Sequence, residues 1–499
     1  MAILSSEGYR GGAFPLTEAL ATAVLLLVVV GLSACSLAPT YQRPAAPIPA
    51  RLNGNGEHVS GTVNKGTTPV ELSESERVFL TTFSPHHDLT ALVKRALENN
   101  RDFRIAALQV QQARVLNRID RAQQLPAVAA AAQFERQHFN NPGLDERYGQ
   151  NLSAAAIGVS DFELDFFGRV RNLSDASNHR YLASVEGQCA FRGALIAEVL
   201  RAYVIERAAS AAAEQLQAVD ADTQTMLSMT ERQQQVGTLS QDELNLLRSD
   251  AEHTHMRLLQ AQVDETTSRN ALQLIVGYVS TDTAGTFNEL SSLDEPLDSV
   301  ASLPSEVLLQ RPDIMQAEGR LRASNADIGA ARAAFFPSIQ LSTSLGTASN
   351  GLIGLFESGT GVWTFVPQIT LPIFDYGRNR ANLELAQLRN EQAVAEYEKV
   401  VQSAFHEVSE ALTIRGPLIE RLHREQALLA TERERVGRAG RRFNAGWEDR
   451  PTLLAARVRL AHANVSCIES QQALTLNRLA LYRALYGAQI AVLPSTAKA

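Results

Sequence analysis

The chain has 499 residues, a formal net charge of −8 and 20% charged residues. This length allows two or three ordinary globular domains, and the acidic balance gives no indication of a nucleic-acid partner. Aromatic residues make up only 6% of the chain, and alanine is abundant. Such a composition suits closely packed helices better than a conventional core built from large side chains.

Residues 1–34 have the features of a signal peptide. The apolar run Ala19 to Leu32 has 14 residues, which is too short for a membrane-spanning helix of about 18 residues or more. It leads into Leu-Ser-Ala-Cys at 32–35, which resembles the lipobox of bacterial lipoproteins. The resemblance implies cleavage between Ala34 and Cys35, a covalent lipid on Cys35, and sorting to the outer membrane of a Gram-negative bacterium. An ordinary secretory signal followed by an incidental cysteine is the alternative.

After Cys35 the chain is rich in proline as far as residue 50. Proline excludes a helix interior and a central strand, so this stretch is predicted to be an extended tether. The other two cysteines, Cys189 and Cys467, lie far apart on predicted helices. Cys189 continues the apolar series that includes Ile196 and Tyr203, so we expect a packed thiol rather than a metal ligand or a nucleophile.

The rest of the chain contains two copies of one unit. Residues 98–130 are similar to residues 308–340, and five landmarks recur at separations of 209 to 211 residues. These are the pairs Asp102 and Asp313, Pro126 and Pro337, Gly168 and Gly377, Gly237 and Gly446, and Gly277 and Gly487. The spacing predicts repeats over 86–277 and 304–486, joined by a linker at 278–303 and followed by a tail at 487–499.

Each repeat is predicted to run helix, strand, loop, strand, long helix, turn, helix. The expected strands are 126–139, 151–166, 337–348 and 361–374. Their apolar residues alternate with polar ones, most clearly in the second repeat, and their length matches that of a tilted strand in a membrane barrel. A half-buried soluble hairpin is the alternative for each pair. The helix-strand junctions are expected at Pro126, Gly168, Pro337 and Gly377.

The long helices are predicted to span 69 residues each, from Gly168 to Gly237 and from Gly377 to Gly446, or roughly 100 Å. The second helix holds a heptad pattern that predicts a coiled-coil seam. The seam residues are Val394, Tyr397, Val401, Ala404, Val408, Ala411, Leu418, Leu422, Leu429 and Val436. Four strands cannot close a barrel, and lipid tolerates no unpaired sheet edge, so copies of the chain must share one barrel. Three copies would supply twelve strands.

Four stretches resemble motifs of the outer membrane factor family, the TolC/NodT-like efflux lipoproteins. They are CSLAPTYQRP at 35–44, FELDFFGRVR at 162–171, the segment 303–341 that contains QRPDIMQAEGRLRASNADIGAARAAFFPSIQ, and LPIFDYGRNRANLELAQ at 371–387. The resemblance covers about residues 35–490. It implies a mainly α protein with membrane β-structure: a homotrimer whose 12-stranded β-barrel, with four strands per chain, continues into a periplasmic α-helical barrel.

The same resemblance implies a function and a set of partners. The chain would be the passive outer-membrane exit duct of a tripartite efflux pump, and would not be an enzyme. Its partners would be a periplasmic adaptor (membrane fusion) protein and an inner-membrane pump of the resistance-nodulation-division type. An equatorial domain would form from residues 36–85, 278–303 and 487–499.

The resemblance places adaptor docking at the turns of the two long helical hairpins. The docking candidates are Arg232, Val236, Gly237, Thr238 and Ser240 in the first turn and Arg442, Phe443 and Gly446 in the second. The second turn departs from the usual family pattern because it contains Trp447 and Pro451. The same end of the pore is expected to carry acidic rings, for which the candidates are Asp242, Glu243, Glu448 and Asp449. A plain helix turn and a solvated charge cluster are the alternatives.

The sequence shows no nucleophile elbow, metal motif or phosphate loop, and the pairs His86–His87 and His253–His255 do not have ligand spacing. We therefore expect no enzyme and no cofactor beyond the lipid on Cys35. A lipid-anchored coiled-coil adaptor without a pore remains an alternative, as does a type I secretion duct. The cargo is not indicated: five methionines without a Met or His cluster give no sign of a dedicated copper duct.

Overall fold

The structure, a computed structural model, describes residues 38, 41, 43, 71–84, 89–277, 287 and 304–486. The chain divides into two compact units, residues 1–61 and 62–499, and every helix and strand named below belongs to the second. The predicted signal peptide with Ala34, the predicted lipid anchor Cys35, most of the predicted tether, most of the linker 278–303 and the tail 487–499 lie outside the described residues.

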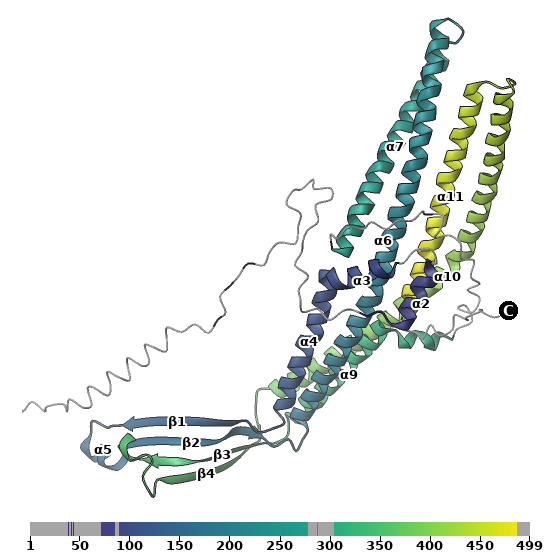
Figure 1. Cartoon of the computed structure of the whole chain (residues 1–499). Helices are drawn as coiled ribbons and strands as arrows, with labels where there is room; N and C mark the ends of the chain where they lie inside the picture. Colours follow the sequence, from purple (N-terminus) through teal and green to yellow (C-terminus); the bar gives the residue numbers. More distant parts are fainter. Residues whose placement is uncertain are drawn as a thin grey trace, which may run out of the picture. The chain divides into compact units, whose positions relative to one another are not determined.

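The two repeats share one order of elements (Figure 1). The first contains α3 (Thr90–Asn99), α4 (Arg101–Ala122), β1 (Val128–Gln137), α5 (Pro142–Tyr148), β2 (Gln150–Glu163), α6 (Arg169–Gln235) and α7 (Gln241–Val276). The second contains η2 (Ser305–Gln310), α9 (Pro312–Ala333), β3 (Ser338–Ser349), η3 (Leu352–Gly354), β4 (Gly361–Thr370), α10 (Arg378–Asn444) and α11 (Arg450–Leu485). An additional helix, α2 (Glu74–Phe83), precedes both repeats. Among the described residues, no helix has the length and apolar character needed to cross a membrane.

The long helices α6 and α10 have 67 residues each. Each folds back through a turn into a shorter helix, and the resulting hairpins pack side by side in the order α7, α6, α11, α10. The predicted seam of α10 is confirmed where Ala404, Ala411, Leu422 and Leu429 are buried. Val394 is exposed instead, because α11 ends at Leu485, which packs with the seam at 397–408 and leaves Val394 beyond the end of that helix.

One proline interrupts the hydrogen bonding of α10 near its middle. Pro417 lies inside the helix and has no N–H to donate to the carbonyl four residues earlier. The Thr413 hydroxyl, on the preceding turn, donates to the Ser409 carbonyl at 2.7 Å. The corresponding helix of the first repeat, α6, contains no proline.

The four strands form one antiparallel sheet in the order β1-β2-β3-β4. Directly paired residues share a face of a sheet, so the register shows which side chains lie together. Leu345 pairs with Trp363 and Ile339 with Ile369, so the apolar residues of β3 and β4 gather on one face. The opposite face carries mainly polar side chains, together with Val362 and Val366, which largely matches the predicted alternation.

A β-bulge in β2 explains why alternation in the first repeat is weak in the sequence. The register shifts between Val159 and Phe162, so that two residues of β2 oppose one residue of β3. Asp161, within the bulge, has a φ of 54°, and its N–H donates to the Ser342 hydroxyl at 3.0 Å. The extra residue shifts the phase by one, and Ile157, Val159 and Phe162 therefore share the apolar face.

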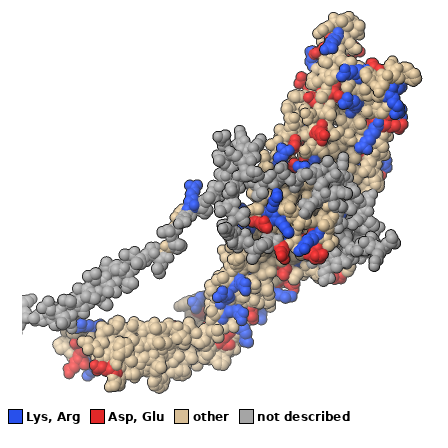
Figure 2. All heavy atoms as spheres, in the orientation of Figure 1, with Lys and Arg blue, Asp and Glu red and all other residues tan. Residues whose placement is uncertain are grey.

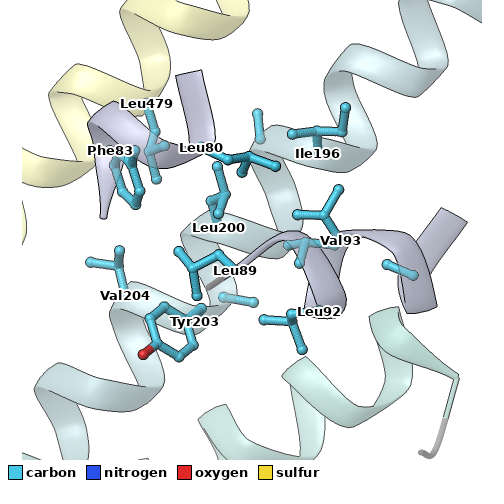
Figure 3. Close-up of a cluster of buried hydrophobic side chains, with 14 of the residues drawn as sticks. Leu80, Phe83, Leu89, Leu92, Val93, Ile196, Leu200, Tyr203, Val204 and Leu479 are labelled. Atoms are coloured by element: carbon cyan, nitrogen blue, oxygen red, sulfur yellow. The ribbon is translucent and has the colours of Figure 1, made fainter. Parts of the chain in front are cut away.

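The largest apolar cluster lies where α2, α3, α6, α7 and α11 meet. Figure 3 shows Leu80 of α2 close to Leu200 of α6, with Leu92 and Val93 of α3 to the side of Leu200 and Tyr203. The predicted equatorial segment therefore contains a docked helix that its sequence had not indicated. The predicted packed thiol of Cys189 is wrong for the single chain, where Cys189 is exposed, since its series along α6 becomes buried only from Ile196 onward.

A buried carboxylate fixes α2 to both repeats. Glu76 is 2% exposed and accepts hydrogen bonds from Arg192 of α6 at 2.7 and 2.8 Å. It also accepts from the hydroxyl of Tyr486 at 2.9 Å and from the N–H of Ser73 at 2.8 Å. Burial raises the pKa of Glu76, but the bonds from Arg192, Ser73 and Tyr486 outweigh it and hold the pKa below its ordinary value of 4.5.

Replacing Glu76 with glutamine should loosen α2. We expect a loss of about 3 kcal/mol at neutral pH, because Arg192 loses its charged partner in a largely buried site. A carboxylate whose pKa is lower in the folded chain than in the unfolded chain stabilises the folded state at any pH above the unfolded-chain pKa. This stabilisation is lost as the pH falls through the folded-chain pKa. The difference between variant and wild type, measured by thermal unfolding and by proteolysis near α2, should therefore shrink as the pH falls below 4.5 and through the lowered pKa of Glu76. Glu74→Gln, on the exposed side of the same helix, is the control; equal stability of wild type and Glu76→Gln at pH 7 would contradict the prediction.

Candidate functional site

The first hairpin turn, residues 232–240, closes α6 with a regular motif. Gly237 has a φ of +74°, which glycine adopts without the strain that a Cβ would cause. The N–H of Thr238 donates to the carbonyl of Gln233 at 3.0 Å, as in a Schellman motif. Ser240 then begins α7 as its N-cap.

The second turn, residues 441–450, repeats this geometry. Gly446 has a φ of +76°, and the N–H of Trp447 donates to the carbonyl of Arg442 at 2.9 Å. Asp449 is the N-cap of α11. The two turns therefore differ in side chains but share one backbone conformation, which makes them matched surfaces at the end of the hairpins away from the sheet.

Apolar side chains project from both turns into open space. Val236 is 74% exposed in the first turn and Trp447 is 78% exposed in the second. Phe443, another predicted docking residue, is exposed one turn before Trp447. Exposed apolar residues on rigid turns are typical of contact sites for another protein.

Two of the four gate candidates cap helices. The Glu243 carboxylate accepts from the Ser240 N–H at 3.1 Å and the Ser240 hydroxyl at 2.8 Å, and these bonds lower its pKa. Asp449 accepts from the Thr452 N–H at 3.0 Å, and hydrogen bonding to Thr452 lowers its pKa. Both carboxylates therefore have a structural role that the gate prediction had not included.

The other two gate candidates differ from each other. Glu448, which is half-buried, lies 3.6 Å from the Nε of the exposed Arg442 within the second turn. Asp242 is exposed, and no described residue forms an ion pair or a side-chain hydrogen bond with it. The structure of the single chain does not bring the four carboxylates into one cluster, since Asp242 and Glu243 lie on one hairpin and Glu448 and Asp449 on the other.

An ion pair that the sequence reasoning missed joins the two hairpins. Arg457 of α11 lies 3.0 Å from a carboxylate oxygen of Asp222 on α6. Burial raises the pKa of Asp222, and the positive charge of Arg457 opposes that rise. Farther from the turns, the side-chain amide of Asn464 donates to that of Gln215 at 3.0 Å. No sequence motif marks these contacts, because they depend on how two distant helices align.

The four predicted junction residues lie where helices meet the sheet. Pro126 falls between α4 and β1, and Pro337 falls between α9 and β3. Gly168 and Gly377 are the N-caps of α6 and α10. All four helices therefore reach the same end of the sheet, and the hairpin turns lie at the other end of α6 and α10.

The sheet and the helices each have two open edges. Within the described residues, β1 and β4 have a strand partner on one side only. Beside the sheet, α4 packs on α6, α6 on α9 and α9 on α10, so that α4 and α10 are the outer helices. Both outer helices, and α7 in the hairpins, expose apolar side chains. They include Ile105, Leu108, Val115, Leu116 and Ile119 on α4, Met256, Leu259, Val263 and Leu274 on α7, and Leu385, Leu388, Phe405, Ile414 and Leu428 on α10.

Comparison with known proteins agrees with this architecture. The sequence model described as outer membrane efflux protein matches residues 92–278 and 303–487, close to the two predicted repeats. The chain belongs to the outer membrane efflux protein family. It is 35% identical over 465 residues to the cation efflux system protein CusC of Escherichia coli O6:H1, covering 92% of this chain and 97% of that one. It is 36% identical over 471 residues to the toluene efflux pump outer membrane protein TtgI of Pseudomonas putida, covering 93% and 97%.

Solved structures support the same assignment. The open state of the MtrE outer membrane channel of Neisseria gonorrhoeae matches with a TM-score of 0.69 and 32% identity, covering 91% of this chain and 98% of that chain. This efflux protein is therefore an outer-membrane channel component of an efflux system. Within the described residues, no group of three or more His, Cys, Asp or Glu side chains is placed to hold a metal ion.

Proposed function

We propose that three copies of this efflux protein form one closed duct, in which a 12-stranded membrane barrel continues into a tube of helices. The duct conducts small molecules passively from the periplasm to the exterior. It is not an enzyme: the inner-membrane pump supplies the energy, and this chain forms only the channel through which the molecules pass. A covalent lipid on Cys35 anchors each copy to the outer membrane.

The observation that carries this proposal is that the unpaired strand edges and the outermost helices lie on the same two sides of the chain, both in the sheet and in the helical part. The free strand edges are those of β1 and β4, and the outer helices beside the sheet are α4 and α10. In the hairpins the outer helices are α7 and α10. One edge of the chain is thus formed by β1, α4 and α7, and the other by β4 and α10. Joining one copy to the next pairs strand with strand and apolar helix with apolar helix throughout.

The sheet itself is suited to lipid. Between Pro337 and Phe374, which include β3 and β4, the only charged residue is Glu357 in the connecting loop. The apolar face would contact lipid, and the face with Gln340, Ser344 and Thr364 would line the pore. A strand of ten residues rises ~33 Å, which is enough to cross the ~25 Å apolar band of an outer-membrane barrel when tilted.

The hairpin turns are the proposed docking surface for a periplasmic adaptor, which would link the duct to an inner-membrane pump of the resistance-nodulation-division type. Their shared Schellman geometry and exposed Val236 and Trp447 support this role. Among the gate candidates, Asp242 is the best suited to a ring of like charges in the trimer. Glu243 and Asp449 are used as caps, and Glu448 is paired with Arg442.

The cargo is proposed only as small molecules. CusC is named for cation efflux and TtgI for toluene efflux, and this chain is about equally similar to both. A passive duct that serves such different cargo selects little by itself, and the pump would set the specificity.

Disulfide cross-linking between β1 and β4 tests the assembly. If the two ten-residue strands overlap fully with matched faces, Ala131 of one copy lies next to Gln368 or Val366 of the next copy. In a background without Cys189, Ala131→Cys combined with Gln368→Cys or Val366→Cys should give dimers and trimers on non-reducing gels. The control Ala131→Cys with Ala156→Cys joins register partners of one chain and should stay monomeric. A soluble monomer with neither cross-link would instead favour a coiled-coil protein without a pore.

A further inference from the structure

We propose that arginines at the helix-strand junction form a ring that binds the phosphate groups of anionic glycerophospholipids in the periplasmic leaflet of the outer membrane. This inference rests on the proposed function, since it requires the sheet to cross that membrane. It assigns a partner to a surface that neither the pore nor the hairpin turns use.

The arginines occupy equivalent positions in the two repeats. Each repeat places one arginine in the last turn of the helix before the sheet and two in the first turn of the helix after it. The first repeat has Arg121, Arg169 and Arg171, and the second has Arg332, Arg378 and Arg380. Their separations of 211, 209 and 209 residues equal those of the neighbouring landmarks. Three copies would therefore carry eighteen arginines at one level.

Among the described residues, five of these six side chains find no carboxylate partner. Arg169 forms an ion pair with Glu163, with its Nε 2.9 Å from the carboxylate. The other five are exposed, and none forms an ion pair or a side-chain hydrogen bond with a described residue. Arginines deeper in the helical part, such as Arg192 and Arg207, have glutamate partners.

The position of these arginines does not favour the helices that carry them. The first turn of a helix is its positive end, where a cation is unfavourable. The nearby carboxylates are used by the backbone: Asp165 accepts from the N–H of Arg171 at 2.7 Å, and Asp375 accepts from the N–H of Asn379 at 2.9 Å. Apart from Arg169, which pairs with Glu163, the arginines at the positive ends of α6 and α10 therefore indicate an external anion.

The surroundings identify that anion as a lipid phosphate. Phe166, Phe374 and Tyr376 are 70%, 77% and 91% exposed beside the arginines, and exposed aromatic residues mark the membrane-water interface of barrels. Figure 2 shows an uncharged sheet surface with blue side chains gathered where the sheet joins the helices. Arginine binds phosphate with paired N–H donors. The arginine ring is thus continuous with the lipid-facing surface and lies at the depth of the headgroups.

Lipid selectivity tests the proposal directly. The full protein would be reconstituted in phosphatidylcholine bilayers, and spin-labelled phosphatidylglycerol and phosphatidylcholine would be compared for association with it. We expect the wild type to prefer phosphatidylglycerol several-fold, since each arginine near an anionic membrane surface contributes a roughly fivefold effect. The variant Arg121→Gln/Arg171→Gln/Arg380→Gln, which keeps Arg332 and Arg378, should lower this ratio markedly toward one. Raising the salt concentration should weaken the wild-type preference.

A matched control removes the same charge elsewhere. Arg104, Arg320 and Arg421 are exposed on helices that contain or adjoin the ring, but each lies at least 12 residues, or about 18 Å, from the sheet. Their triple replacement by glutamine should leave the lipid preference unchanged. An unchanged preference in the ring variant, or none in the wild type, would overturn the inference. So would loss of SDS-resistant trimers by the ring variant in phosphatidylcholine, which would assign the arginines to contacts between copies. If neither spin-labelled lipid were immobilised by the protein, the four-stranded sheet would not cross the membrane, and the proposed function would be refuted as well.

Discussion

Phe365→Arg should prevent the protein from accumulating as a trimer in the outer membrane. Phe365 lies in the middle of β4 on the apolar face, opposite Thr343. An arginine facing lipid near the bilayer midplane costs ~2–4 kcal/mol, and the trimer would carry three of them. The expected loss of roughly 6–12 kcal/mol per trimer is comparable to the whole stability of a typical domain. Outer-membrane fractionation and gels run without heating would show the loss of the trimer band.

The neighbouring residue provides the control for this experiment. Val366 has the same apolar character and is 54% exposed against 59% for Phe365, but it faces the opposite side of the sheet. Val366→Arg should point into the water-filled pore and leave the trimer intact. In a soluble hairpin that stays exposed on both faces, as in the single chain, both substitutions would face water and have similar small effects. Equal tolerance of the two substitutions would therefore refute a membrane barrel.

Gly237→Arg should abolish efflux and leave the trimer assembled. The left-handed conformation at Gly237 costs a side chain about 1–2 kcal/mol, and a Cβ there would meet no atom within 4 Å. The folded turn should survive this local cost, while a bulky cation in the middle of the docking surface should block the adaptor. Tolerance to the exported compounds should fall to that of a strain without the channel, with an unchanged amount of trimer.

Gly359→Arg separates docking from general damage. Gly359 has a φ of +95°, and it too has no atom within 4 Å of a built Cβ. It lies in the β3–β4 loop, at the opposite end of the molecule from the turns. The backbone strain and open space are therefore matched, and Gly359→Arg should preserve efflux. Normal export by Gly237→Arg, or equal loss of export in both variants, would argue against docking at the first turn.

Local periodicity made most of the fold predictable. The heptad of α10 depends on residues three and four apart, and Ala404 and Ala411 are buried where it placed them. The repeated landmarks also predicted the two hairpin turns, because Gly237 and Gly446 occupy the same position in the two repeats. The capping role of Glu243 could also have been predicted, because Ser240 and Glu243 have the Ser-x-x-Glu spacing of a capping box.

The features that escaped prediction depend on distant parts of the chain. The bulge at Asp161 is held by Ser342 from another repeat, and an alanine-rich strand hides the change of phase. Docking of α2 depends on Arg192 reaching Glu76 across 116 positions of sequence. The Asp222–Arg457 pair requires two hairpins to align side by side. None of these contacts produces a periodic signal.

The proline in α10 gives the two kinds of hairpin unequal stiffness. Pro417 removes one backbone hydrogen bond near the midpoint of α10, so bending there meets less resistance than at the same height in α6. In the proposed trimer, three α10–α11 hairpins that bend more easily would alternate with three stiffer α6–α7 hairpins. Bending of the first three would widen the end of the helical tube, while the other three hold its length and direction.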